Sequence, residues 1–303
     1  MLRALLLCLS ERKTPQRFLT NLPAVRKLHE RFVAGESIAE ALAAVGHLRG
    51  DGFEFTLDHL GESVHDPATA AAATQAYLQI LDRLKDACLR PNISIKLTSL
   101  GLAFDEALAR RNLAALADRA CQHQGFVRID MEGSPYTEST LRVFRALDAP
   151  RDRVGVVIQA YLHRSEKDVQ NLTAVGAWVR LTKGAYQEPA SIAFPKKAQV
   201  DANYVKLMTM LLASSGYHAI ATHDPRMIAA TQEYAREKGI GPDRFEFQML
   251  YGVRRRLQRE LLKQGYRVRI YVPYGRQWYP YFMRRLAERP ANVLFLLRNL
   301  ARG

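Results

Sequence analysis

The sequence predicts a (β/α)8 barrel of the TIM type with an N-terminal helical extension. The first observation is that short β-branched or apolar runs alternate with longer helical stretches from about residue 50 onward. The second is that eight such runs occur at near-regular spacing, which favours a closed barrel over a doubly wound open sheet, the main alternative. The third is the absence of G-x-G-x-x-G and G-x-x-x-x-G-K-[ST] patterns, which argues against two common nucleotide-binding folds.

The individual elements follow from apolar runs and from their cap and turn residues. Residues 1–50 show only helical patterns, and Ser37-Ile-Ala-Glu40 is a capping box that opens an Ala/Leu-rich helix ending near Gly50. The predicted strands are Phe53–Leu57, Ile93–Leu97, Phe126–Ile129, Val154–Ile158, Trp178–Leu181, His218–Ala221, Phe245–Phe247 and Val268–Val272. The helices between them include Pro67–Cys88, Glu106–Gln122, Thr137–Leu147 and Pro225–Lys238. No linker or low-complexity run divides the chain, so we predict an extension over residues 1–50 and one barrel domain over residues 51–303.

Composition narrows the class of protein. With 303 residues, 48% hydrophobic and 24% charged, the chain is typical of a globular protein. The three widely spaced cysteines predict neither a disulfide framework nor a metal pair, and they favour a reducing compartment. The formal charge of +14 is compatible with nucleic acid, an anionic membrane or an acidic substrate as partner. The basic residues are dispersed, however, and no nucleic-acid module accompanies them, so no nucleic-acid partner is expected.

The first ten residues, MLRALLLCLS, resemble the apolar core of a signal peptide. The run is short and no small-residue cleavage site follows it, so we interpret it as the first helix of the fold. No segment approaches the ~18 apolar residues that a membrane span requires.

The segment RIYVPYGRQWYPYFMRRLAE near the C-terminus reads as a short strand, a Pro/Gly turn and an aromatic-rich helix. Neighbouring residues of a helix point about 100° apart, so at least one of Arg284 and Arg285 is expected against the protein body. Beside Tyr279 and Tyr281, the two arginines resemble a carboxylate clamp with an apolar wall. The alternative is a solvated helix in which Arg284 and Glu288 form a weak surface pair.

In a (β/α)8 barrel the active site lies at the C-terminal ends of the strands. The predicted strands carry or precede Asp58, Lys96, Asp130, Gln159, Lys183, His223, Gln248 and Tyr271 at these ends. Several have structural alternatives, because a strand-end Asp such as Asp58 or Asp224 commonly caps the next helix and His223 alone is often structural. Lys183 could be a solvated loop residue, whereas Lys96 inside an apolar strand requires an anion or a function. No close histidine spacing suggests a metal site.

Six segments, in consistent order, resemble those of proline dehydrogenase, most closely the short monofunctional bacterial type. They are Ser94–Thr98, Arg128–Glu132, Arg180–Tyr186, Ala221–Asp224, Phe245–Gln248 and Tyr281–Glu288. The resemblance implies FAD-dependent oxidation of L-proline to Δ1-pyrroline-5-carboxylate, with hydride transfer to flavin N5. It also implies that FAD is held on strand-end loops, which agrees with the missing glycine-rich fingerprint.

The resemblance further implies a role for particular residues around the substrate. Arg284 and Arg285 would bind the proline carboxylate, with Lys96 adding positive charge. Asp130 would lie beside Lys96, and Glu62 would form an ion-pair gate with Arg284. The walls of the pyrrolidine pocket would be Leu181, Tyr186, Tyr271 and Tyr281.

On the flavin side, the resemblance implies that Arg180 and Gln159 approach the isoalloxazine ring. The ring, ribityl chain and phosphates would be held by Lys183, Gly184, Ala185, Thr222, His223, Gln248 and Glu288. Gly184 fits a place where the backbone approaches the cofactor closely, and Lys183 can supply charge to the pyrophosphate. Cations around the substrate would favour loss of the proton from the proline amine.

The resemblance implies a membrane quinone as the electron acceptor. We expect a cytoplasmic protein with peripheral contact at the inner face of the cell membrane, with which the basic charge and the apolar N-terminal segment are compatible. Two other functions remain open from the sequence. A Schiff-base (β/α)8 aldolase or lyase would use Lys96 or Lys183 and no flavin. A basic nucleic-acid-binding protein would show steeply salt-dependent affinity and no cofactor. The oligomeric state is not predicted.

Overall fold

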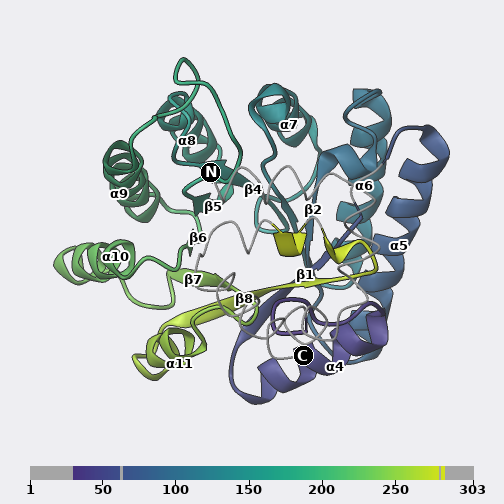
Figure 1. Ribbon diagram of the computed structural model, residues 1–303, viewed down its shortest axis with the longest axis horizontal. Helices are drawn as coiled ribbons and strands as arrows, with labels where there is room; N and C mark the ends of the chain where they lie inside the picture. The colour runs from purple at the N-terminus through teal and green to yellow at the C-terminus, as the bar shows by residue number, and fades with distance from the viewer. Residues whose placement is uncertain (1–29, 62–63, 280, 284–303) are drawn as a thin grey trace, which may run out of the picture.

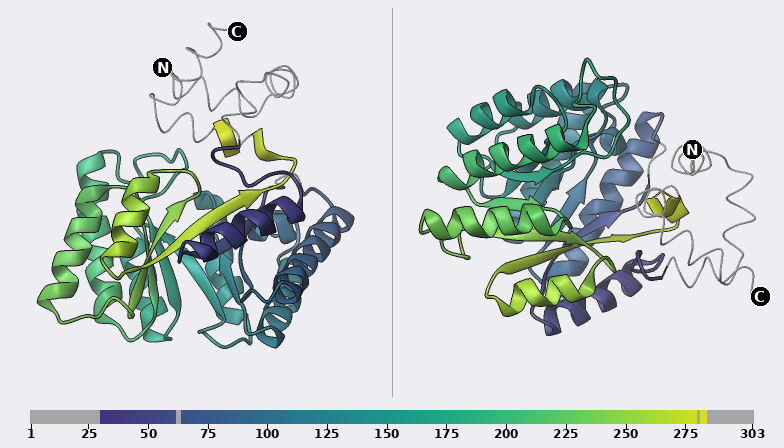
Figure 2. Two further views of the ribbon diagram at one scale, coloured as in Figure 1. Left: turned by 90° about the horizontal axis from the view of Figure 1, so that it is seen from below. Right: turned by 60° about the vertical axis from the view of Figure 1, so that its left-hand side comes forward.

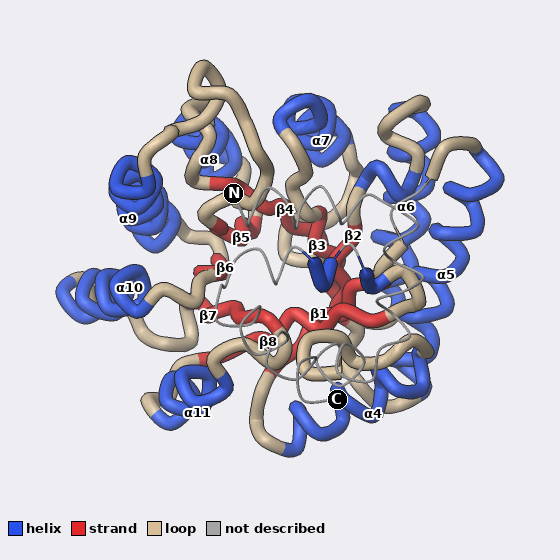
Figure 3. The backbone as a smooth tube through the Cα atoms, in the orientation of Figure 1, coloured by secondary structure: helices blue, strands red, loops and turns tan. Residues whose placement is uncertain are grey.

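The fold is a closed eight-stranded parallel barrel surrounded by helices. The computed structural model describes residues 30–61, 64–279 and 281–283. In this part of the chain each strand pairs with the next, and β8 pairs with β1 to close the barrel. Figure 1 shows the strands at the centre with the helices around them, and Figure 3 distinguishes the two by colour. The predicted (β/α)8 barrel is therefore confirmed.

The observed strands agree with the predicted ones except at their ends. They are β1 Glu54–His59, β2 Asn92–Ile95, β3 Phe126–Ile129, β4 Val154–Gln159, β5 Trp178–Thr182, β6 His218–Ala221, β7 Phe245–Leu250 and β8 Arg267–Tyr274. The strands β3 and β6 have the predicted bounds, whereas β8 is longer because its ladder with β1 continues to the pair His59 and Tyr274. Register with a neighbouring strand, which local composition does not encode, sets these ends.

The helices cover the outside of the barrel. They are α4 Ile38–Gly50, α5 Pro67–Asp86, α6 Glu106–Gln122, α7 Ser134–Ala146, α8 Ser165–Ala174, α9 Lys197–Ala213, α10 Pro225–Glu237 and α11 Arg255–Lys263, with a short 3-10 helix η1 at Leu97–Leu100. The predicted bounds of α6 are confirmed, and the other predicted helices differ by one to three residues at an end. Within the described ranges, none of the helices combines the length and the apolar character that crossing a membrane requires.

The helix α4 precedes the barrel and lies along β1 and β8, as Figure 2 shows. Its capping box is present: the Ser37 hydroxyl accepts a hydrogen bond from the Glu40 amide at 3.3 Å, and the Glu40 carboxylate accepts from the Ser37 amide at 2.9 Å. These bonds satisfy amides that the first turn of a helix leaves unpaired. Residues 1–29 of the predicted extension lie outside the described residues.

The residue Lys96 does not lie inside a strand, contrary to our prediction. Strand β2 ends at Ile95, and Lys96 is the N-cap residue of η1. The turn is fixed locally, because the Ser99 hydroxyl donates to the Lys96 carbonyl oxygen at 2.5 Å and Gly101 closes η1 with φ of 109°. A left-handed φ of this size is readily adopted by glycine. The chain therefore turns at the point where Lys96 leaves the sheet.

The barrel interior is largely polar, and most apolar residues of the strands face the helices. TIM barrels usually fill the interior with branched aliphatic side chains. Here side chains that are at most 4% exposed include the polar and charged groups Thr56, Ser94, Arg128, Arg180, Glu246 and Gln248. The alternate positions, such as Val127, Val179 and Phe247, belong to the hydrophobic core. Because side chains of a strand alternate between faces, the core lies between the sheet and the helices.

One buried histidine on the outer side of the barrel is held in its neutral form. His218 on β6 is 1% exposed; its Nδ1 accepts from the Val179 amide at 3.2 Å, and its Nε2 lies 2.7 Å from the Ser214 hydroxyl. Burial, with a smaller contribution from the charge of Arg128, lowers the pKa of His218 from 6.5 to about 4. Protonation at Nδ1 would remove the acceptor for the Val179 amide.

We expect this histidine to make stability depend on pH. In the unfolded chain His218 binds a proton below about pH 6.5, whereas in the native state it does so only below about pH 4. The free energy of unfolding should therefore decrease as the pH is lowered from 6.5 to 4. The fall attributable to His218 is at most about 3 kcal/mol. His218→Asn, which keeps an acceptor but does not titrate, should flatten the dependence in urea unfolding at pH 7, 5.5 and 4.5. His47→Asn, at an exposed histidine, is the control. If the free energy of unfolding depends on pH equally in both variants, the assignment to His218 is wrong.

Candidate active site

The C-terminal ends of the strands surround a cavity of about 440 Å³. This is the end of the barrel at which the sequence predicted the site. Among the residues that line it are the predicted Lys96, Asp130, Gln159, Arg180, Lys183, Gly184, Ala185, Tyr186, Thr222, His223, Gln248, Tyr271 and Tyr281. The structure thus brings together predicted residues from segments that are far apart in the sequence. Among the described residues, no cluster of three His, Cys, Asp or Glu side chains could hold a metal ion.

The position of Leu181 differs from the expected one. Its side chain is fully buried in the hydrophobic core, whereas its neighbours Arg180 and Thr182 line the cavity. Successive residues of a strand face opposite sides, so the orientation of Arg180 directs Leu181 towards the helices. The remaining predicted residues, Glu62, Arg284, Arg285 and Glu288, lie outside the described residues.

The cavity also contains residues to which the family resemblance gave no role, although Asp58 and Asp224 stand at the strand ends that we expected to form the site. They are Asp58, Met131, Val157, Thr182, Ala221, Asp224, Met249 and Leu250. The period of two along a strand could have identified Thr182 and Leu250, which follow Arg180 and Gln248 by two residues. No local signal marks which apolar residues reach the cavity.

Asp130 lies at the centre of a buried polar network. Its Oδ1 accepts from Arg180 Nη1 at 2.6 Å, and its Oδ2 accepts from the Tyr271 hydroxyl at 2.8 Å. Arg180 also donates to the Ser94 hydroxyl at 3.0 Å, and its guanidinium lies 5.4 Å from the centre of the Tyr271 ring. Burial raises the pKa of Asp130, although the Arg180 charge lowers it in part. The network fixes three cavity side chains relative to one another.

Lys96 faces a second buried carboxylate. Its Nζ lies 3.4 Å from both carboxylate oxygens of Asp58, which is 1% exposed. Asp58 does not cap the next helix, because Asp66 accepts from the Thr69 amide at the start of α5. The strand-end aspartate is therefore the counter-ion of Lys96.

Lys183 is not a solvated loop residue. Its Nζ lies 2.5 Å from Asp201 on α9 and 2.8 Å from Asp224 at the start of α10. Asp224 also caps α10 by accepting from the Arg226 amide at 3.0 Å. Although burial raises the pKa of Asp224, hydrogen bonds from Lys183 and from this amide lower it to about 2. Asp201 carried no signal in the sequence, since it lies in the middle of a helix pattern.

Gly184 is required by its backbone angle and by a neighbouring ring. Its φ is 111°, and a Cβ at this position would lie 2.2 Å from the ring of Tyr161. We expected a close approach of a cofactor here, and the structure adds Tyr161 as a reason for the glycine. The loop after β5 can therefore pass close to the ring only without a side chain.

Amide and imidazole side chains also line the cavity. His223 Nε2 accepts from the Leu250 amide at 2.9 Å, and the Gln159 side chain donates to the Glu132 carbonyl oxygen at 2.9 Å. Gln248 donates to Glu246 at 2.5 Å, while its Oε1 is buried and has no hydrogen-bond partner among the described residues. An unpaired buried acceptor of this kind is costly unless a ligand supplies a donor.

We expect Asp130→Asn to destabilise the protein much more than Tyr271→Phe. The first change leaves the buried Arg180 guanidinium without its counter-ion, which costs about 3–5 kcal/mol, whereas the second removes one hydrogen bond worth about 1 kcal/mol. The free energies of unfolding in urea measure the two effects. Equal losses in the two variants would mean that the ion pair contributes no more than the hydroxyl does.

Comparison with known proteins identifies the family. Residues 41–298 match the family model of proline dehydrogenase. Proline dehydrogenase 2 of Bacillus subtilis is 41% identical over 272 residues and 90% of each chain, and proline dehydrogenase of Deinococcus radiodurans is 43% identical over 281 residues and 91% of each chain. The structure of proline utilization A from Bdellovibrio bacteriovorus is similar with a TM-score of 0.83 at 27% identity, over 95% of this chain and 36% of that longer one. The family model and the two dehydrogenases cover most of this chain, including the cavity, so the chain belongs to the proline dehydrogenase family.

Proposed function

We propose that this protein oxidises L-proline to Δ1-pyrroline-5-carboxylate with FAD as its cofactor. The observation that carries the proposal is the cavity at the C-terminal ends of the strands, lined by Lys96, Asp130, Arg180 and Tyr271 in a chain of the proline dehydrogenase family. The cavity offers positive charge for a carboxylate and aromatic wall for a small ring. Such a combination suits an amino acid with a cyclic apolar body.

The described residues fit a flavin. Met131, Val157 and Met249 supply apolar surface, which suits a flat aromatic ring, and the buried Oε1 of Gln248 can accept from a ring N–H. Among the described residues, Gln159, Arg180, Ala185, Thr222 and His223 are the further candidates for holding the cofactor. Bound FAD would supply the acceptor for the hydride that leaves the substrate carbon.

The loop that follows β5 suits the cofactor phosphates. The side chains of Lys183, Lys197 and Arg226 surround Asp201 and Asp224, so the cluster carries three positive and two negative charges. The net positive charge supports binding of a pyrophosphate, and Gly184 is exposed, so its backbone is accessible to a ligand.

The residues of this chain would bind and orient the substrate. We propose that Lys96 adds to the positive charge that holds the carboxylate, while Tyr186, Tyr271 and Tyr281 form the walls around the ring. The cations Lys96 and Arg180 would disfavour a further positive charge on the bound amine and so promote loss of its proton. A neutral nitrogen can then donate its lone pair as the hydride leaves.

Four residues outside the described part of the chain complete the proposal through the family resemblance. Arg284 and Arg285 would clamp the carboxylate, and Glu62 would close the site by pairing with Arg284. Glu288 would contact the cofactor. We further propose a quinone as the electron acceptor and peripheral contact with the inner face of the cell membrane.

The geometry of the two lysines argues against a Schiff-base aldolase or lyase. Lys183 is engaged by two carboxylates and Lys96 faces Asp58. Either amine would have to leave these partners before it could attack a carbonyl carbon. The flavin-dependent function is therefore the better supported of the two.

The visible absorbance spectrum before and after anaerobic addition of L-proline tests the proposed function. We expect a yellow protein whose flavin bands bleach on addition of proline, and D-proline serves as the matched control. Flavin that L-proline does not bleach would discard proline as the substrate. A colourless protein that FAD does not reconstitute would overturn the cofactor assignment as well.

We also expect Lys96→Met to weaken proline binding while leaving the flavin in place. Loss of one charge-assisted contact to a carboxylate should raise the KM for proline about tenfold or more. The matched control is Lys206→Met on α9, where the lysine pairs with Glu166 at the surface. Steady-state kinetics and the flavin spectrum of each variant measure the two effects. Wild-type KM in Lys96→Met would remove this lysine from the substrate site.

A further inference from the structure

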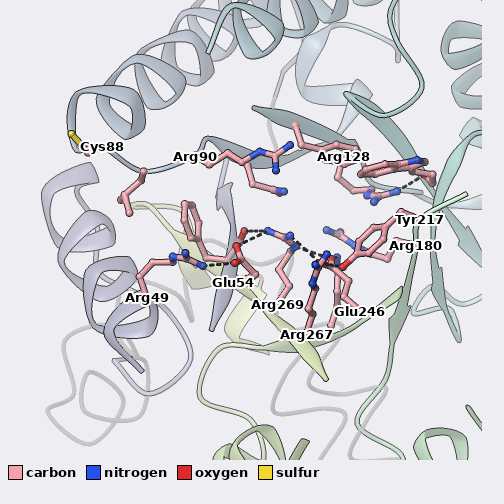
Figure 4. Close-up of a pocket in the computed structure, with 16 residues that line it drawn as sticks. Arg49, Glu54, Cys88, Arg90, Arg128, Arg180, Tyr217, Glu246, Arg267 and Arg269 are labelled. Atoms are coloured by element: carbon pink, nitrogen blue, oxygen red, sulfur yellow. Dashed lines mark hydrogen bonds and ion pairs between the residues drawn. The ribbon is translucent and has the colours of Figure 1, made fainter. Parts of the chain in front are cut away.

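A second cavity lies at the N-terminal ends of the strands, opposite the candidate active site. Its volume is about 440 Å³, and its lining includes the arginines 49, 90, 128, 180, 267 and 269 but only two carboxylates, Glu54 and Glu246. Figure 4 shows Arg90 and Arg128 on one side of this cavity and Arg267 and Arg269 on the other. The interior of the cavity therefore carries an excess of positive charge.

The two carboxylates are already engaged by two of the arginines. Glu246 accepts from Arg269 Nε at 2.7 Å and from Nη2 at 2.9 Å, and Glu54 pairs with Arg49. Arg180 pairs with Asp130 in the other cavity. Among the described residues, Arg90, Arg128 and Arg267 form no ion pair. The positive charge that remains is contributed by these three side chains.

Arg128 is the buried member of the three. It is 4% exposed, and its Nη1 donates to the carbonyl oxygens of Trp178 at 2.5 Å and Val156 at 3.3 Å. Its Nε is buried without a hydrogen-bond partner among the described residues. A Cβ on Gly155 would lie 2.3 Å from Nη1, so the absence of a side chain there leaves space for the guanidinium. The glycine at position 155 thus provides the space that the Arg128 side chain occupies.

The environment of Arg128 is unfavourable for a lone cation. Burial lowers the pKa of Arg128 well below its ordinary value, the nearby charge of Arg180 lowers it further, and the charge of Glu246 offsets this only in part. A guanidinium nevertheless retains its proton in a protein. The electrostatic free energy of this site therefore improves when an anion lies beside it.

Aromatic side chains complete the wall. Phe126 lies under the Arg128 guanidinium at 4.7 Å and stacks on Trp178 with ring centres 5.6 Å apart. The guanidinium of Arg267 lies 5.8 Å from the centre of the Tyr217 ring. These contacts orient the guanidinium groups, and planar donors of this kind suit oxyanions better than spherical halide ions.

We propose that this cavity binds a small multivalent oxyanion, one with phosphate or carboxylate groups, between Arg90, Arg128 and Arg267. Arg180 and Gln248 line both cavities and separate this site from the candidate active site. The proposal does not depend on the identity of the substrate at the other end of the barrel. It assigns a ligand-binding role to an end of the fold that usually contributes only stability.

Titration calorimetry of the FAD-loaded protein tests the proposal, with inorganic pyrophosphate and with citrate at constant ionic strength set by chloride. We expect saturable binding of at least one of them at a single site. The anion that binds with the higher affinity shows whether the site recognises phosphate or carboxylate groups. Loading with FAD keeps pyrophosphate away from the proposed cofactor site.

Matched variants locate the binding site. Arg90→Gln and Arg267→Gln change exposed side chains, so both variants should fold, and each should weaken binding about tenfold. Arg256→Gln on α11, whose side chain is 94% exposed, should bind as the wild type does. Absence of saturable binding of both anions, or equal affinity in all three variants, would overturn the proposal.

Discussion

The ion pair between Arg180 and Asp130 is the interaction on which the arrangement of the barrel interior depends. Arg180 extends from β5 to Ser94 on β2, and Asp130, which directly follows β3, also accepts from Tyr271 on β8. Four strands therefore meet at one buried pair. Breaking a buried ion pair costs about 3–5 kcal/mol. The strands are therefore held in positions that keep this pair formed. The network thus gives the cavity a fixed set of polar side chains.

This pair is possible because the inner face of the strands is largely polar, whereas most TIM barrels fill the interior with branched aliphatic side chains. Most branched aliphatic side chains face the helices, and the interior receives hydroxyl, amide and charged groups together with aromatic rings such as that of Tyr271. The same alternation explains Leu181: once Arg180 faces inward, its neighbour must face the helices. Sequence similarity alone assigned Leu181 to the cavity, whereas the period of two would have excluded it. Strand geometry is thus an independent check on residues carried over from a family.

Sequence reasoning predicted the barrel from periodicity, and it predicted most of the described cavity residues from the strand ends together with the family resemblance. It missed interactions between distant segments. Asp201 pairs with Lys183 because α9 packs beside β5. Asp58 is a counter-ion of Lys96 and does not cap a helix. Lys96 was placed in a strand because the apolar run continues past the point where the chain turns into η1. Long-range pairing and the ends of strands are set by neighbouring segments, which a linear pattern does not contain.

A charged interior has a further consequence for the two ends of the barrel. With an aliphatic interior, the two cavities would be separated by a layer without charges, and each would be electrostatically independent. Here Arg180 and Gln248 line both cavities. Gln248 also donates to Glu246, which pairs with Arg269 in the second cavity. In a medium of low dielectric, charges interact over such a chain of contacts with little screening. Arg180, the ion-pair partner of Asp130, is therefore the charged residue that the two described cavities share.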